Sequence, residues 1–280
     1  MFKIQTLNNI SLRGLERLPR DRYEVASELV RPDALLVRSA DVHAIEIPAS
    51  VLAVARAGAG TNNIPVAKLS QRGIPVFNAP GANANAVKEL VLAGLFLAAR
   101  NICQAWDYVR KLEGDDHALE SAMEQGKKKF VGHELPGRTL GVVGLGAIGV
   151  EVANAALHLG MKVMGYDPQI TVQRAWQLSS GVEQALSLDD LFARSDIVTV
   201  HVPLNDATRS LVNEARIRLM RRGSAVLNFA RAQIVDEAAV LAGLEQGQLS
   251  TYVCDFPTRA VKAHARVVAL PHLGASTGEA

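Results

Sequence analysis

The stretch LGVVGLGAIG at residues 140–149 decides the fold of this chain. Its apolar first part predicts a buried parallel strand, Leu140–Val143, and Gly144, Gly146 and Gly149 follow it in G-x-G-x-x-G spacing. An alanine-rich helical pattern comes next. In such a turn the first glycine permits a tight bend, the second lets a pyrophosphate approach the backbone, and the third lets helix and strand pack closely. The strand–turn–helix context therefore predicts a dinucleotide site.

The start of that helix and a later acidic residue complete the predicted cofactor site. The amides of Ala147 and Ile148 lie in the first turn, where the helix dipole favours phosphate. Asp167 ends the next predicted strand, 18 residues after Gly149. An acid at about that distance binds the ribose hydroxyls, and it repels a 2′-phosphate, so we expect NAD rather than NADP. The alternative is a chance glycine cluster, with Asp167 only a turn residue before Pro168.

Short apolar runs alternate with helical patterns along the whole chain, which indicates an α/β fold. Before residue 88 we expect strands at 34–37, 52–55 and 75–77 and a helix at 66–72. A long, largely buried helix at 88–112 and a polar connection at 113–130 follow. After Thr139 we expect strands at 140–143, 162–166, 197–202, 225–229, 251–254 and 267–270, and helices at 149–159, 188–194, 213–219 and 237–245.

These elements predict two Rossmann or flavodoxin-like domains with doubly wound parallel sheets around a cleft. We expect residues 1–87 to form a flavodoxin-like substrate domain and residues 88–280 to form the NAD-binding Rossmann domain.

The composition excludes several classes of protein. The 280 residues carry a formal net charge of +2, and the longest basic run is Lys127–Lys129, so no nucleic acid is expected as a partner. The longest apolar stretch, Leu90–Ala99, is too short to span a bilayer. Cys103 and Cys254 are the only cysteines, which argues against a disulfide framework or a zinc site. We expect a cytoplasmic protein with a small-molecule substrate and no metal.

Two polar side chains after later strands predict hydride-transfer chemistry on a 2-hydroxy acid. Ligands of open α/β sheets bind at the carboxyl ends of the strands. Arg231 follows one strand, and its planar guanidinium can hold a substrate carboxylate bidentately. His272 follows another, and an imidazole exchanges protons near neutral pH, so it suits the acid/base role. Taken alone, each could be an ordinary surface or loop residue.

The chain resembles the D-isomer-specific 2-hydroxyacid dehydrogenases over almost its whole length. Within that family it most resembles the members that oxidise 3-phosphoglycerate to 3-phosphohydroxypyruvate for serine biosynthesis. The segments that carry the resemblance are LLVRSA (35–40), ARAGAGTNNIPV (55–66), VFNAPGANANAVKELVLAGLFLAAR (76–100), GRTLGVVGLGAIGVEVANAALHLGMKVMGYDP (137–168), HVPLNDATRSLVN (201–213), NFARAQIVDE (228–237) and PHLGASTGEA (271–280).

The resemblance implies roles for further residues of the cofactor site. Arg231 would orient the substrate, His272 would act as the acid/base, and Asp255 would hold the nicotinamide carboxamide. The other residues assigned to the cofactor groove are His201, Pro203, Thr208, Ala230 and Gly274. His201 could equally be a plain strand-end histidine. Family members pair through the helices around residues 88–112 and the NAD domain, so we expect a homodimer.

The substrate side is expected in loops of the first domain. Arg38 and Ser39 follow one predicted strand, and Arg56 and Gly58 follow the next. The glycines after Arg56 would let backbone amides form an anion nest. The corresponding loops of the family contact substrate, so we assign Arg38, Ser39, Arg56, Gly58 and Asn83 to substrate binding. The alternative for both arginines is solvent-exposed loop charge.

Three features depart from the family pattern. No Asp or Glu lies between Phe256 and Glu279, although the family places there a glutamate that pairs with the catalytic histidine. Ala232 stands where the family mostly has glycine. The family continues beyond PHLGAST with a helix that returns to the first domain, which we therefore expect to be incomplete.

Two alternative functions stay open. One is a glyoxylate or hydroxypyruvate reductase, or another D-2-hydroxyacid dehydrogenase. The other is an NAD-sensing binding protein with impaired catalysis, which the missing glutamate makes conceivable.

Overall fold

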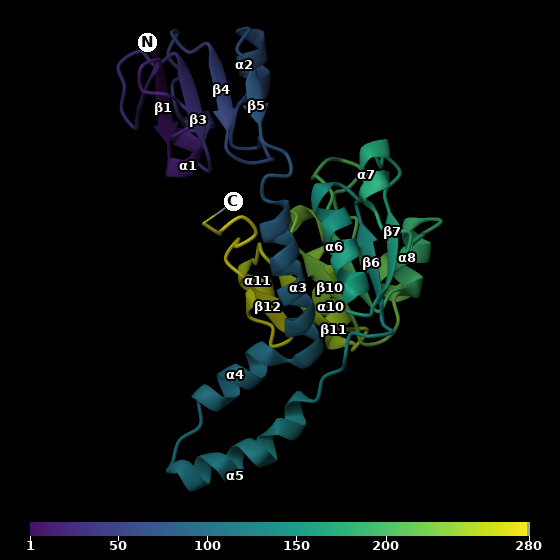
Figure 1. The fold of residues 1–280 in the computed structure, drawn as a ribbon. Helices are drawn as coiled ribbons and strands as arrows, with labels where there is room; N and C mark the ends of the chain where they lie inside the picture. Colours follow the sequence, from purple (N-terminus) through teal and green to yellow (C-terminus); the bar gives the residue numbers. More distant parts are fainter. Residues whose placement is uncertain (279–280) are drawn as a thin grey trace. The chain divides into compact units, whose positions relative to one another are not determined.

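The computed structural model describes residues 1–278 and forms two compact α/β units (Figure 1). The first unit comprises Met1–Asn83 together with Thr277 and Gly278, and the second comprises Ala84–Ser276. The division falls at the start of a long helix, α3 (Ala84–Arg100), four residues earlier than the sequence analysis placed it.

The first unit is built on a five-stranded parallel sheet in the order β2-β1-β3-β4-β5, the flavodoxin-like order. Its strands are β1 (Phe2–Leu7), β2 (Tyr23–Ala26), β3 (Ala34–Val37), β4 (Ala53–Arg56) and β5 (Val76–Asn78), and its helices are α1 (Leu12–Leu15), η1 (Val42–Ala44) and α2 (Val66–Gln71). The last three strands and α2 confirm the sequence predictions to within a residue. β1 and β2 were not predicted, because their partly exposed strands carry mixed polar and apolar residues.

The second unit holds a seven-stranded parallel sheet in the order β12-β11-β10-β9-β6-β7-β8. Numbered within the unit, this is the Rossmann order 3-2-1-4-5-6 with a seventh strand added. Its strands are β6 (Thr139–Val143), β7 (Lys162–Tyr166), β8 (Val182–Gln184), β9 (Ile197–Val200), β10 (Ser224–Asn228), β11 (Leu249–Cys254) and β12 (Val267–Ala269). The order reverses between β6 and β9, where such sheets bind ligands.

Helices cover both faces of this sheet, as the doubly wound prediction requires (Figure 1). On one face, α3 and α6 pack together over a core that includes Val91, Leu95, Val150 and Ala153. On the other face, helices α8, α9 and α10 enclose Phe192, Ile217 and other core residues. From β6 onward, the helices of this unit are α6 (Ala147–His158), α7 (Val172–Gln177), α8 (Leu188–Arg194), α9 (Glu214–Leu219), η3 (Ala232–Ile234), α10 (Glu237–Glu245) and α11 (Arg259–Lys262).

The predictions for residues 88–130 were partly wrong. The single buried helix at 88–112 is two helices, α3 and α4 (Ile102–Arg110), separated at Asn101 by a left-handed backbone conformation. No residue of α4 is buried. The polar stretch is not an irregular connection, because Asp115 caps a helix, α5 (Asp116–Gly126), that continues into η2 (Lys127–Phe130). Together α4 and α5 form an arm that projects from the layers of this unit (Figure 1).

The helices of residues 1–278 are too short or too polar to span a lipid bilayer.

A histidine lies where the central strands of the second unit end. His201 directly follows β9, and its backbone N–H donates to the carbonyl of Val143 at the end of β6, at 2.7 Å. Its ring Nε2 lies 3.0 Å from the hydroxyl of the fully buried Thr199. Although the residue keeps a partly exposed surface, burial lowers the pKa of the imidazole to about 4. His201 is therefore neutral in the folded protein at pH 7.

This lowered pKa predicts acid-sensitive folding. Unfolding returns His201 to a pKa near 6.5, so the unfolded state binds the extra proton first, and stability is lost as the pH falls from about 6.5 toward 4. Between pH 7 and pH 4.5 the wild-type chain should lose about 2 kcal/mol more unfolding free energy than a His201→Gln variant. Urea unfolding at the two pH values measures this difference. An equal loss in both chains would contradict it.

Candidate cofactor and substrate site

The three glycines after β6 differ in what surrounds them. A Cβ on Gly149 would overlap the carbonyl oxygen of Gly144, and a Cβ on Gly144 would lie 2.7 Å from the carbonyl oxygen of His201. Gly144 also has a φ of +89°, which favours glycine. Gly146 has no protein atom within 4 Å of its Cβ position, and its φ is −74°. Packing explains Gly144 and Gly149, whereas the space at Gly146 leaves room for another molecule to approach the backbone.

The N-terminus of α6 is open. Gly146 is its N-cap and offers no side-chain acceptor to the amides of the first turn, which include those of Ala147 and Ile148. Six other helices of the second unit have a side-chain N-cap; these caps are Asp115, Thr171, Ser187, Asn213, Asp236 and Thr258. Open amides beside an uncrowded glycine fit the phosphates of a dinucleotide.

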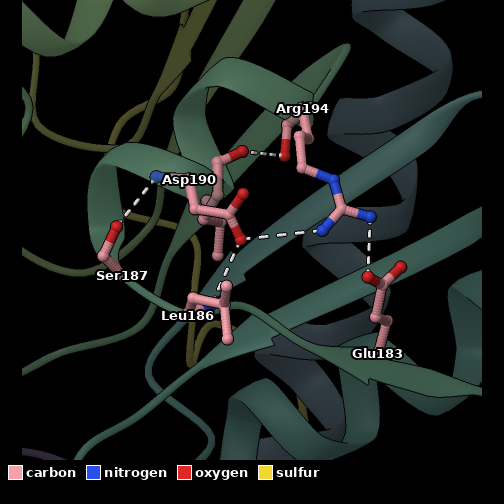
Figure 2. A network of polar contacts seen from close by, with 7 residues as sticks. Glu183, Leu186, Ser187, Asp190 and Arg194 are labelled. Carbon is pink, nitrogen blue, oxygen red and sulfur yellow. Dashed lines mark hydrogen bonds and ion pairs between the residues drawn. The ribbon is translucent and has the colours of Figure 1, made fainter.

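The N-terminus of helix α8, unlike that of α6, is capped by side chains of the chain itself. The hydroxyl of Ser187 accepts the amide of Asp190, while the Asp190 carboxylate accepts the amide of Leu186 and pairs with Arg194 (Figure 2). Arg194 also pairs with Glu183. The start of α8 is thus satisfied by its own side chains and offers no comparable anion site.

Asp167 is tied to the glycine turn by its own carboxylate. One oxygen accepts the amide of Leu145, at 2.9 Å, and the other accepts the amide of Gln169, at 2.9 Å. The residue follows β7, whose last residue pairs with Val143. The acid therefore stands beside the turn with a lone pair left on each oxygen, which suits the predicted hydrogen bonds to ribose hydroxyls.

The loop after β9 is closed by internal hydrogen bonds. The Thr208 hydroxyl donates to the carbonyl of Pro203, at 2.6 Å, and the Thr208 amide donates to the Asn205 side chain, at 3.0 Å. Pro203 and Thr208 thus shape one turn at this edge of the sheet. Asn205, which the sequence analysis did not assign, holds that turn together.

Arg231 follows β10 in a loop held by a buried asparagine. Asn228 donates to the Arg231 carbonyl, at 2.9 Å, and accepts the Ala230 amide, at 3.1 Å. The half-buried guanidinium donates to the Ala230 carbonyl, and its burial lowers its pKa. No carboxylate among residues 1–278 forms an ion pair with it. Sequence reasoning missed Asn228, whose signal is a polar residue at the end of an otherwise apolar strand.

His272 lies after β12 and is bound to the end of β11 through Asp255. The Asp255 carbonyl accepts the His272 amide at 3.0 Å, and its carboxylate accepts the amides of Leu273 at 2.7 Å and Gly274 at 2.9 Å. Asp255 is 1% exposed. The structure thus gives Asp255 a loop-holding role that the sequence analysis did not foresee, beside the predicted contact with nicotinamide.

The loops predicted to hold substrate lie at one edge of the first unit's sheet. Arg38 follows β3, and Arg56 ends β4, where it pairs in register with Val37. The Arg56 side chain donates to the Arg38 carbonyl, at 3.2 Å. Asn83 is half-buried directly before α3.

The expected anion nest is not formed by the amides next to Arg56. The Gly58 amide donates to the Arg56 carbonyl, at 2.9 Å, and the Ala57 amide donates to the Val37 carbonyl. The Ser39 amide donates to the side chain of Asn8, at 3.1 Å. These three amides therefore do not contribute to an anion nest at this edge.

Comparison with known proteins agrees with this geometry. Residues 92–274 match the model of the D-isomer specific 2-hydroxyacid dehydrogenase NAD binding domain. The chain is 37% identical to D-3-phosphoglycerate dehydrogenase of Sus scrofa over 99% of its length, and it spans about half of that relative. It is 35% identical to hydroxypyruvate reductase of Thermotoga maritima, over 95% of this chain and 84% of that one.

Solved structures give the same family. D-mandelate dehydrogenase of Rhodotorula graminis aligns with a TM-score of 0.81 and 26% identity, over 99% of this chain and 89% of that one. An NAD⁺-bound 3-phosphoglycerate dehydrogenase of Entamoeba histolytica aligns with a TM-score of 0.74 and 25% identity, over the same shares. With the glycine turn, the open helix start and the acid after β7 in place, the chain belongs to the D-isomer specific 2-hydroxyacid dehydrogenases and uses NAD as its cofactor.

Proposed function

We propose that this chain oxidises D-3-phosphoglycerate to 3-phosphohydroxypyruvate with NAD, as a step of serine biosynthesis. The observation that carries the proposal is the half-buried guanidinium of Arg231, which has no carboxylate partner among the described residues. A buried cation without a counter-ion is unfavourable unless a ligand supplies the charge, and the carboxylate of a 2-hydroxy acid would do so. A cytoplasmic location belongs to the same proposal, and cell fractionation would test it.

The chain's own residues would carry out the acid/base part of the reaction. Arg231 would bind the substrate carboxylate and polarise the oxygen on C2. His272 would take the proton of the C2 hydroxyl at an imidazole nitrogen as the C2–H bond breaks and the C2–O bond becomes a carbonyl. NAD supplies the acceptor for the hydride that leaves C2. The groups already described around Gly146, Asp167 and the loop after β9 would hold that cofactor.

The proposed substrate also carries a phosphate. We assign Arg38, Ser39, Arg56, Gly58 and Asn83 of the first unit to the distal end of the substrate. Arg38 and Arg56 lie at the carboxyl ends of the adjacent parallel strands β3 and β4, at the same edge of the sheet. Guanidinium groups bind phosphate through charge-assisted hydrogen bonds.

Hydroxypyruvate reductase is the second candidate. The reductase of Thermotoga maritima is matched over 84% of its length, more than the half of the phosphoglycerate dehydrogenase of Sus scrofa. Its substrate, to judge from its name, lacks the phosphate, so phosphate dependence separates the two functions. A non-catalytic NAD-binding protein is the remaining alternative, and it would bind NADH without turnover.

The deciding experiment is an NADH-oxidation assay on 3-phosphohydroxypyruvate and hydroxypyruvate. We expect kcat/KM to be at least about 100-fold higher on the phosphorylated substrate, because two arginines would pair with the phosphate. Arg231→Gln should lower kcat/KM by at least about 100-fold, and His272→Asn should lower kcat by about 10²–10⁴-fold. NADH affinity should survive both changes.

Arg222→Gln is the matched control, because Arg222 is an exposed arginine two residues before the amino end of β10, and its side chain donates to the carbonyl of Gln246. It should leave turnover unchanged. Equal activity on both substrates would favour the reductase. NADH binding without turnover would favour the sensor, and unchanged turnover in Arg231→Gln or His272→Asn would remove that residue from the mechanism.

We propose that two copies of the chain associate through the arm of α4 and α5. This arm carries large apolar side chains on its surface, although none of its apolar side chains is buried within residues 1–278. They are Ile102, Trp106, Val109 and Met123, with Val131 directly after η2. Several large exposed apolar side chains on one projecting segment are typical of a protein interface, whereas a single one, such as Trp106 at 61% exposure taken alone, is ordinary.

Trp106→Asp should weaken this association. Light scattering after gel filtration should give twice the 30.0 kDa chain mass for wild type and a shift toward the single chain for the variant, by at least about a 100-fold change in dimer Kd. Trp176→Asp is the control, because Trp176 is 85% exposed on α7, away from the arm. A monomeric wild type, or equal effects of both substitutions, would rule out the arm as the interface.

A further inference from the structure

The imidazole of His272 lacks the partner that a general base normally has. No hydrogen bond joins either ring nitrogen to another group within residues 1–278, and the residue is exposed. Between Phe256 and Gly278 the chain contains no Asp or Glu. The adjacent carboxylate, Asp255, is already used by the amides of Leu273 and Gly274. A general base that accepts a proton at one ring nitrogen still needs its ring to be held in one orientation.

The backbone of His272 is held firmly. Its φ is +55°, a left-handed conformation that is uncommon outside glycine and costs about 1 kcal/mol or more. Three hydrogen bonds to Asp255 hold residues 272–274 in that conformation. They fix the Cα and Cβ of the histidine, but not the rotation of its ring, because the χ2 angle of histidine has broad minima.

One side chain contacts the ring itself. The phenyl ring of Phe256 lies with its centroid 4.6 Å from that of the His272 imidazole, at an interplanar angle of 55°. This separation lies within the favourable range for aromatic pairs. Phe256 directly follows Asp255 at the end of β11, so two consecutive residues hold the histidine, one through its backbone and one through its ring.

We propose that Phe256 is the positioning residue of the catalytic base in this chain, and orients the His272 imidazole by aromatic contact in place of a carboxylate. The inference rests on the proposed role of His272. Phe256 touches neither substrate nor cofactor in this assignment. It acts by limiting the imidazole to orientations in which a ring nitrogen can reach the C2 hydroxyl.

This role predicts which kinetic constant changes. Loss of the phenyl face leaves the imidazole, its backbone and Arg231 in place, so substrate binding is retained while fewer bound molecules have the base correctly oriented. The effect should therefore appear in kcat rather than in KM. A flat ring should restore it, whereas an aliphatic side chain of similar size should not.

The test is a kinetic double-mutant cycle on the full chain. Phe256→Leu should lower kcat on the best keto-acid substrate by about 10-fold, with KM and NADH affinity within about twofold of wild type. Phe256→Tyr should keep kcat within about threefold. When Phe256→Leu is added to His272→Asn, kcat should fall no further, because Phe256 acts only through the histidine.

Phe130→Leu is the matched control. Phe130 is also a half-buried phenylalanine in an aromatic pair, with Tyr108 at 5.3 Å, but it ends η2, directly after the arm. Its substitution should leave kcat unchanged. If Phe256→Leu lowers kcat equally with and without His272, or leaves it unchanged while His272→Asn abolishes turnover, the positioning role is wrong. If His272→Asn itself has no effect, the proposed function fails instead.

A spectroscopic readout is independent of turnover. The ring current of Phe256 should displace the carbon-bound imidazole proton signals of His272, identified by their loss in His272→Asn. Those signals should move toward free-histidine positions in Phe256→Leu and remain displaced in Phe256→Tyr. Signals that stay in place in Phe256→Leu would show that the two rings are not in contact in solution, and would overturn the proposal.

Discussion

Helix α6 can begin beside the end of β6 only because Gly149 has no side chain, since any Cβ there would occupy the space of the Gly144 carbonyl. This close approach determines where the helix starts and which amides point out of its first turn. At the same end of β6, Gly144 lies against the carbonyl of His201, directly after β9, where the strand order of the sheet reverses. These two close approaches shape the edge of the sheet at which a dinucleotide site is expected.

The other functional loops depend on the same edge. Every strand of the second unit's sheet runs parallel, so the segments after β6, β7, β9, β10, β11 and β12 all leave on one side. Polar side chains then fix individual loops: the half-buried Asp167 holds the glycine turn, and the buried Asn228 and Asp255 hold the Arg231 loop and the His272 loop. Each of these accepts or donates backbone hydrogen bonds while the residue it supports stays available for ligand.

Much of this arrangement could be predicted from local sequence. A strand with a buried centre, Lys162–Tyr166, and a helix with a side-chain N-cap, Leu188–Arg194, were predicted with their observed bounds, because the local pattern and the tertiary structure agree there. β1 was not predicted because its apolar and polar residues alternate irregularly and its side chains are partly exposed. The prediction for the arm failed because α4 and α5 bury almost nothing within the chain. The apolar spacing suggested a buried helix, but no other element of residues 1–278 covers these side chains.

The sequence was enough to predict which residues belong to the candidate site, but not which of them contact one another. The spacing of Gly144, Gly146 and Gly149 is enough to predict their role. Asp255 can accept backbone hydrogen bonds from the His272 loop only because β11 lies next to that loop, and no local sequence pattern predicts this adjacency. The same applies to Phe256, whose ring meets an imidazole 16 residues away. Long-range pairing of the strands creates both contacts.

The central claim, that the turn after β6 binds the dinucleotide, is tested most directly at Gly146. A Cβ there has open space among residues 1–278 and the backbone has a negative φ, so Gly146→Val should change Tm by less than about 4 °C. It should nevertheless weaken NADH binding, followed by fluorescence titration, by at least about 100-fold, because the added methyl groups occupy the approach to the pyrophosphate. Gly14→Val, equally uncrowded in the first unit, should leave NADH binding unchanged. Full NADH affinity in a folded Gly146→Val chain would contradict the account.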